Sequence, residues 1–122
     1  MKDLEYKKFK QAQYFYAQDY WGVLLGPDIK IYQAGSLSSG QLIKIYLEIS
    51  NQKIIDIRVQ VYGGPYLIIA AGYFCEFVLN KNLKEILEKF SLEKIWADLN
   101  FPEHKKSILL LLEDILQNLL ST

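Results

Sequence analysis

The chain has 122 residues, which favours a single domain over 1–122 that is long enough to bury a core of its own. Lysine plus arginine and aspartate plus glutamate both total 14, so no net charge favours nucleic acid or a membrane as a partner. One cysteine excludes an internal disulfide, and no apolar run approaches the roughly 20 residues that span a bilayer. Because the amino terminus also lacks a signal-like apolar stretch, we expect a cytoplasmic protein.

The first twenty residues have the period of an amphipathic helix. Aromatic residues recur at intervals of three and four with one polar interruption, at Tyr6, Phe9, Gln13, Tyr16 and Tyr20. This spacing predicts an amino-terminal helix whose aromatic stripe packs on the rest of the domain. A membrane-binding or cofactor-binding face is the alternative, and the mixed Lys, Asp and Gln residues opposite the stripe do not favour it.

From Ile29 onward the period changes to two, which is typical of strands. A short strand is expected at 29–33, and a second at 41–49 places Lys44, Tyr46 and Glu48 on its polar face. The apolar face of the second strand carries Ile43, Ile45, Leu47 and Ile49. After a polar turn at 50–53, the apolar face of the third strand carries Ile55, Ile57, Val59 and Val61. The two longer strands therefore form a hairpin with one buried and one solvated face.

The second half of the chain reads as helices. Pro65 suits the first position of a nearly all-apolar helix that runs to about Val78. Asn82 with Glu85 resembles a capping box, which opens a short helix at Leu83, and another short helix is expected at 92–98. Pro102 is expected to start the last, long helix, with a core-facing stripe of Ile108, Leu112, Ile115 and Leu119. The pattern predicts an α+β domain in which helices cover one face of a three-stranded antiparallel sheet.

Three segments resemble the ligand motifs of a known metallocluster scaffold. They read Gly-Ser-Leu-Ser-Ser-Gly at 35–40, Tyr-Gly-Gly-Pro at 62–65 and Phe-Pro-Glu-His-Lys at 101–105. In the iron-sulfur cluster assembly scaffolds of the IscU and NifU amino-terminal domain family, these motifs read roughly Gly-Ala-Pro-Ala-Cys-Gly-Asp, Tyr-Gly-Cys-Gly and Leu-Pro-Pro-Val-Lys-Ile-His-Cys. The resemblance continues through 75–87 and Glu113-Asp114, covers about the whole chain and implies the same α+β fold, with an amino-terminal helix and a long carboxy-terminal helix.

The family's ligand positions carry other residues in this chain. Aligned without gaps, the family's first cysteine and its aspartate fall on Ser39 and Gln41, and its second cysteine falls on Gly64. Its histidine and third cysteine fall on Ser107 and Ile108. The family would bind a 2Fe-2S cluster or zinc there, and a cluster needs soft thiolate ligands. The positions in this chain offer an alcohol, an amide, no side chain, a second alcohol and a hydrocarbon. We therefore predict that these five residues do not bind metal and that the protein has no cofactor.

Two other chemistries can be considered from single residues. Cys75 lies eleven residues beyond Gly64 in an apolar helix, so it is too far away to replace a ligand and is interpreted as a small hydrophobic residue. His104 with Ser107 and Asp98 could be written as a catalytic triad or, with Glu103, as a zinc site. The chain has neither a Gly-x-Ser-x-Gly motif nor a zinc-ligand spacing, so we expect no enzyme.

The remaining candidates are interaction surfaces. Phe101, Pro102 and Lys105 resemble the family's chaperone-recognition motif, while Leu110 and Leu111 fall on the polar side of the last helix. These leucines are either a partner interface or isolated exposed apolar residues. The resemblance implies protein partners, namely a cysteine desulfurase, a DnaK-type chaperone or a true scaffold.

The resulting hypothesis is a non-catalytic accessory protein of iron-sulfur cluster assembly. An alternative is a small-molecule binding domain that reuses the emptied site as an aromatic pocket, with aromatic area from Tyr62, Tyr66, Tyr73 and Trp96. An enzyme that uses His104 and Ser107 is the third and weakest hypothesis.

Overall fold

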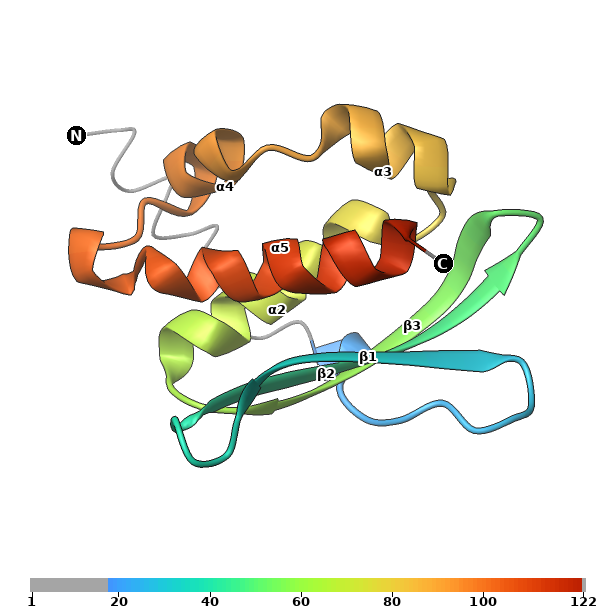
Figure 1. Ribbon diagram of the computed structural model, residues 1–122, viewed down its shortest axis with the longest axis horizontal. Helices are drawn as coiled ribbons and strands as arrows, with labels where there is room; N and C mark the ends of the chain where they lie inside the picture. The colour runs from blue at the N-terminus through green and yellow to red at the C-terminus, as the bar shows by residue number, and fades with distance from the viewer. Residues whose placement is uncertain (1–17, 122) are drawn as a thin grey trace.

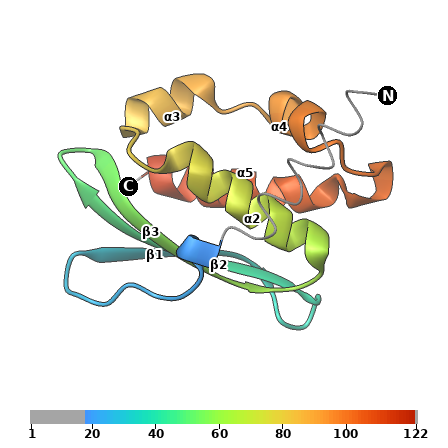
Figure 2. The same ribbon diagram turned by 180° about the vertical axis from the view of Figure 1, so that it is seen from behind.

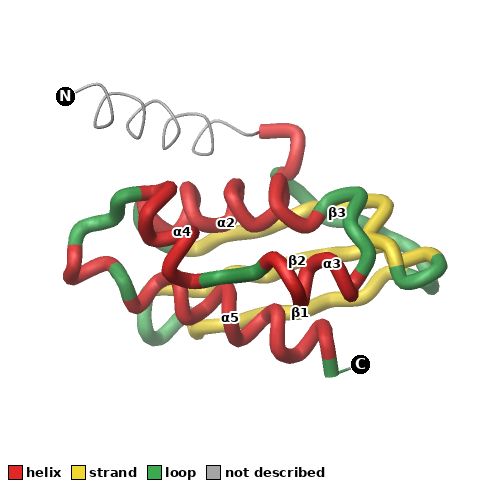
Figure 3. Tube along the Cα trace, turned by 90° about the horizontal axis from the view of Figure 1, so that it is seen from above, coloured by secondary structure: helices red, strands yellow, loops and turns green. Residues whose placement is uncertain are grey.

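The computed structural model of the protein describes residues 18–121. In chain order the elements are η1 (Gln18–Tyr20), β1 (Ile29–Ser36), β2 (Gln41–Ser50), β3 (Lys53–Tyr62), α2 (Pro65–Val78), α3 (Leu83–Lys89), α4 (Leu92–Leu99), η2 (Glu103–Lys105) and α5 (Ser107–Leu120). Figure 1 shows α2 and α5 lying on one face of the sheet, with α3 and α4 above them as an outer layer. Figure 3 shows the same arrangement from above. The predicted α+β class and the covered sheet face are confirmed.

The sheet has the order β1-β2-β3 and is antiparallel throughout. Tyr32 lies opposite Ile45, and Ile45 lies opposite Val59, so these three side chains form one row on the helix-covered face. The hairpin between β2 and β3 turns through Asn51 and Gln52, whose φ angles are both positive, at 52° and 63°. A two-residue turn with both φ angles positive matches the twist of the strands that it joins.

The sheet departs from simple alternation near this hairpin. Glu48 pairs with Asp56 but Ile49 pairs with Ile54, which leaves Ile55 without a residue opposite it. Such a bulge moves the following residues to the other face, so Ile54 is fully buried while Ile55 is 42% exposed. The prediction that Ile55 faces the core is therefore wrong.

Two further strand predictions need correction. β1 runs to Ser36 rather than ending at residue 33, because its pairing with β2 continues to the turn. Tyr46, predicted on a solvated face, is buried on the side away from the helices. Its hydroxyl donates to Gln60 Oε1 at 2.7 Å, and this bond satisfies the polar end of the ring.

Local signals account for the helix starts. α2 begins with Pro65 at its first position and is buried along most of its length, as predicted. The Asn82 side chain accepts from the Glu85 N–H at 2.8 Å and caps α3, and the Ser91 hydroxyl accepts from the Lys94 N–H at 3.3 Å and caps α4. The last helix does not start at Pro102, because the short helix η2 intervenes before α5.

The core lies between the sheet and the pair α2 and α5. α2 packs on β3, α5 packs on β1, and the two helices contact each other. The predicted stripe of α5 is buried and is extended by two more leucines, giving Ile108, Leu109, Leu112, Ile115, Leu116 and Leu119. No helix within residues 18–121 has the length and apolar character needed to cross a membrane.

Residues 1–17 of the predicted amino-terminal helix lie outside the described residues, and its last three residues form the short helix η1. Burial and the neighbouring Glu76 carboxylate raise the pKa of Tyr20 to about 12. The following residue, Trp21, pairs with Val59 on the outer edge of β3, and the Gly22 N–H donates to the Val59 carbonyl at 3.1 Å. These contacts tie the start of the described chain to α2 and β3.

Candidate functional site

The three motif-like segments lie at one end of the molecule. The β1–β2 turn, the β3–α2 junction and the start of α5 are together on the left of Figure 1 and on the right of Figure 2. The first two adjoin, because Leu42 pairs with Tyr62 and a Cβ on Gly63 would lie 3.4 Å from the Gly40 carbonyl oxygen. The second adjoins the third, because the rings of Tyr66 and Phe101 have centroids 5.0 Å apart and meet edge to face.

Ser39 is exposed in the β1–β2 turn, and its hydrogen bonds stay within that turn. Its hydroxyl donates to the Ser36 carbonyl at 2.9 Å and lies 3.3 Å from the Gln41 carbonyl, while its N–H donates to the Ser36 hydroxyl at 3.2 Å. Gly40 follows with a φ of +79°. The Ser39 side chain therefore closes the turn, and Gln41 begins β2 half-buried.

Gly64 is the residue that caps the start of α2. Its φ of −80° is open to any amino acid, and a Cβ added there would meet no atom within 4 Å. Neither backbone strain nor crowding therefore requires glycine at this position.

The two positions at the start of α5 face different surroundings. Ser107 is exposed as the first residue of the helix, whereas Ile108 is 2% exposed and belongs to the hydrophobic core. The structure thus brings Ser107 to the surface at this end and places the Ile108 side chain against the sheet and helices. A buried hydrocarbon has no atom that can bind a metal ion.

The segment that resembles a chaperone motif is partly structural. Phe101 is buried against Tyr66, and Lys105 Nζ lies 5.7 Å from the centroid of the same ring. Pro102 is half-buried, and His104 is exposed. The surface that a partner could reach therefore excludes the Phe101 ring.

The two predicted interface leucines differ in exposure. Leu110 is 53% exposed, as expected, whereas Leu111 is half-buried and packs against the core. The expectation that both leucines are exposed is thus correct for Leu110 alone. The two neighbours differ because one residue step turns the helix by about 100°, which brings Leu111 toward the core.

The remaining reactive side chains do not gather at this end. Cys75 is fully buried in α2, and burial, with the Glu76 charge as a smaller cause, raises the pKa of its thiol far above the ordinary value. Asp98 accepts a hydrogen bond from the Tyr73 hydroxyl at 3.2 Å. Within residues 18–121, no three His, Cys, Asp or Glu side chains come together as ligands for a metal ion.

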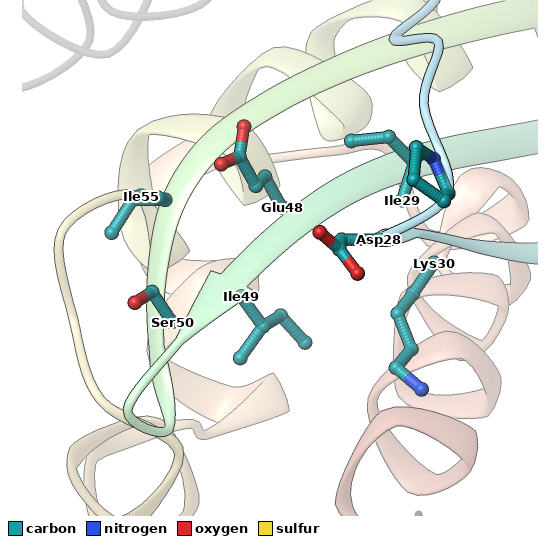
Figure 4. A pocket seen from close by; sticks show the side chains of 8 residues that line it. Asp28, Ile29, Lys30, Glu48, Ile49, Ser50 and Ile55 are labelled. Atoms are coloured by element: carbon teal, nitrogen blue, oxygen red, sulfur yellow. The ribbon is translucent and has the colours of Figure 1, made fainter.

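A polar pocket lies at the opposite end of the sheet. It has a volume of about 370 Å³, and Figure 4 shows its side chains coming from the start of β1, the end of β2 and the bulge of β3. Asp28 and Glu48 supply two carboxylates, with Lys30 nearby. Sequence reasoning missed this pocket because its lining brings together residues of three strand ends, including the unpaired Ile55.

The sequence model of the NifU-like N terminal domain matches residues 10–121. The chain belongs to this family. The iron-sulfur cluster assembly protein IscU of Plasmodium falciparum (isolate 3D7) is 32% identical over 84 residues, which are 69% of this chain and 51% of that protein. The chain therefore spans about half the length of this curated relative.

Solved structures share the fold at lower identity. FiSufU, from the thermophile Fervidobacterium islandicum AW-1, superimposes with a TM-score of 0.70 at 18% identity, covering 89% of this chain and 92% of that one. The amino-terminal part of a NifU-like protein from Brucella abortus gives a TM-score of 0.66 at 14% identity, covering 88% of each chain. The likeness extends over nearly all of both chains, so the NifU N-terminal fold is present without large insertions.

Proposed function

We propose that this NifU-type protein is an accessory component of iron-sulfur cluster assembly that holds no cluster at the family's ligand positions. The observation that carries the proposal is the place of its one cysteine. Cys75 is fully buried in α2, so no thiolate is available at the end where the three segments converge. A 2Fe-2S cluster is held by thiolates, with histidine or aspartate as occasional partners.

The chemistry of the five positions supports this proposal. The Ser39 hydroxyl is engaged with turn carbonyls, Gly64 has no side chain, and Ile108 is buried in the core. A serine hydroxyl must lose its proton to bind iron well, which is unfavourable near neutral pH. The same residues cannot accept persulfide sulfur, because that transfer needs a nucleophilic thiolate. Neither holding a cluster nor receiving sulfur is supported at this end, and we assign the protein no catalytic role.

The accessory role then depends on contacts with proteins. The resemblance to the family's chaperone motif points to Pro102 and Lys105 as contact residues, with a cysteine desulfurase, a DnaK-type chaperone or a true scaffold as the partner. The test is binding of each purified partner to the protein and to its Lys105→Glu variant. Binding that this variant weakens supports the proposal, and binding to none of the three overturns the accessory role.

The loss of the ligand set is tested by restoring it. The restored variant carries Ser39→Cys, Gln41→Asp, Gly64→Cys, Ser107→His and Ile108→Cys. The control variant carries three added thiols at exposed positions away from the site, Gln33→Cys, Ser50→Cys and Asn118→Cys. All three proteins are checked by thermal melting and then incubated anaerobically with iron and sulfide, or with zinc. We expect stoichiometric metal on the restored variant alone.

Two results would contradict this assignment. Stoichiometric iron and sulfide, or about one zinc per chain, on the natural protein would mean that it has ligands elsewhere. A folded restored variant without metal would mean that the five positions are not equivalent to the family's ligands. The difficult position is Ile108, since its replacement removes buried apolar surface worth roughly 1–3 kcal/mol, so a variant that keeps Ile108 is measured beside it.

A further inference from the structure

A groove runs along α5, between that helix and the α3–α4 segment. Two pockets form it, one of about 610 Å³ and one of about 150 Å³, and they adjoin because Leu92 and Glu93 line both. We call these two adjoining pockets the α5 groove. None of the five ligand positions lines it, although Lys106 in the smaller pocket directly precedes Ser107 in the chain.

The α5 groove is apolar along its floor. Phe90, Leu116 and Leu120 line the larger pocket, and Trp96, Leu109 and Leu110 line the smaller one. An apolar cavity of about 150 Å³ is large enough to hold a benzene molecule, so the smaller pocket fits one large apolar side chain. Leu110 is 53% exposed, and Leu87, on the rim of the larger pocket, is 64% exposed. The described chain thus leaves a connected apolar surface uncovered.

The spacing of the groove suits a helical occupant. On α5 the lining side chains recur at intervals of three and four, at Leu109, Glu113, Leu116 and Leu120. From Leu109 to Leu120 the helix rises about 16 Å, or about three helical turns. A helix lying along α5 would present its own side chains at the same interval, which is the usual geometry of an amphipathic helix in an apolar groove.

The charges on the groove give the occupant a direction. Lys106 stands at the end of the smaller pocket, with its Nζ 5.2 Å from the centroid of the Trp96 ring. Glu93 stands where the pockets meet, and Glu113 lines the larger pocket. Lys106 and Glu113 are separated by seven residues on α5, about two helical turns. A complementary helix carries an acidic residue at one end and a basic residue two turns away.

We propose that the α5 groove binds an amphipathic helix of a partner protein, with apolar side chains three and four residues apart, an acidic residue beside Lys106 and a basic residue beside Glu113. The proposal rests on this surface alone and holds whatever the protein's role in cluster assembly.

The proposal is tested with a displayed library of randomised 16-residue helical peptides, selected against the full chain. We expect enrichment of the stated apolar spacing with opposite charges two turns apart. The dissociation constants of the recovered peptides are then measured by fluorescence anisotropy. Leu110→Asp should weaken binding tenfold or more, because it places a charge in the smaller pocket. Leu25→Asp is the matched control, since Leu25 is 88% exposed and far from the groove, and it should change nothing.

The charge pattern is tested independently of the apolar floor. Lys106→Glu and Glu113→Lys should each weaken binding about two- to fivefold, the usual size for an exposed ion pair. A peptide with its two charges exchanged should recover the loss on the double variant. Because Lys106 is exposed, its variant keeps the test decisive even where Leu110→Asp lowers the melting temperature.

Four results would overturn the proposal. They are a library without binders, peptides that bind Leu110→Asp as tightly as the natural protein, a dimer in sedimentation that Leu110→Asp dissolves, and tight binding of a synthetic peptide of residues 1–17. The third would assign the groove to a second copy. The fourth would assign it to the chain's own amino-terminal segment.

Discussion

Gly35 lies near the end of β1, paired with Leu42 of β2 just before the turn between the two strands. Its φ is +83°, and a Cβ there would collide with the backbone carbonyl of Gln41. A side chain is therefore opposed both by the backbone angle and by contact with an atom that cannot rotate away. We expect Gly35→Ala to lower the free energy of unfolding by about 2–4 kcal/mol, measured by urea denaturation.

The matched control is Gly64→Ala. Gly64 has an ordinary φ and open space around its Cβ position, so the variant should lose no more than about 1 kcal/mol, the cost of a poorer helix cap. Equal losses in the two variants would mean that the collision at Gly35 is relieved by movement of the turn.

Cys75 makes the stability depend on pH in the alkaline range. The unfolded thiol titrates near pH ~8.5, but burial raises the pKa of the folded thiol far above that value. Above this pH, loss of the proton therefore stabilises the unfolded chain and not the folded one. The contribution of Cys75 is thus fully present below pH ~8.5 and is lost by about 1.4 kcal/mol for each further pH unit. Cys75→Ala should flatten this decline between about pH 8.5 and 10, measured by urea denaturation across pH. A decline of unchanged slope in the variant would assign it to other groups.

At the scale of elements, the bulge in β3 decides which isoleucine supports the core. Ile54 is fully buried and Ile55 is 42% exposed, although the two are neighbours of identical type. Ile54→Ala should cost about 2–5 kcal/mol of unfolding free energy and Ile55→Ala less than about 1. Thermal and urea denaturation of the pair check this order. A larger loss for Ile55→Ala than for Ile54→Ala would mean that Ile55 faces the core and that β3 alternates without a bulge.

Sequence patterns predicted the elements where the signal was local. Pro65 and the pair Asn82 and Glu85 define their helix starts through contacts within one turn, so no partner element was needed to recognise them. The face of Ile55 could not be predicted in this way, since it depends on the register between β2 and β3. The partner of the buried Tyr46 hydroxyl, Gln60, likewise lies on the neighbouring strand β3 and follows from pairing rather than from β2 alone.

The candidate site shows the same division. Resemblance selected three segments, and the structure places those segments at one end. The direction of the Ile108 side chain into the core was predicted from the period of α5, and the structure confirms it. The groove beside Leu110 was not predicted, because it depends on how α5 sits against α4.

At the scale of the whole molecule, the outer layer should open before the inner ones. α3 buries Ile86 and α4 buries Ile95 and Leu99, whereas α2 is buried along most of its length. We expect amides of α3 and α4 to exchange with solvent through local opening at a free energy about 2 kcal/mol or more below that of α2 and β2. Native-state hydrogen exchange checks this. Uniform protection across these elements would describe a single cooperative unit.

The packing of α5 on β1 has a consequence for how the protein is made. These elements lie near opposite ends of the described chain, and α5 covers the side of β1 that carries Tyr32 and Ala34. During synthesis the sheet leaves the ribosome well before the helix that shields this side. The nascent chain therefore carries an uncovered apolar sheet for as long as it takes to translate four helical segments, and this interval is when it most needs the protection of a chaperone.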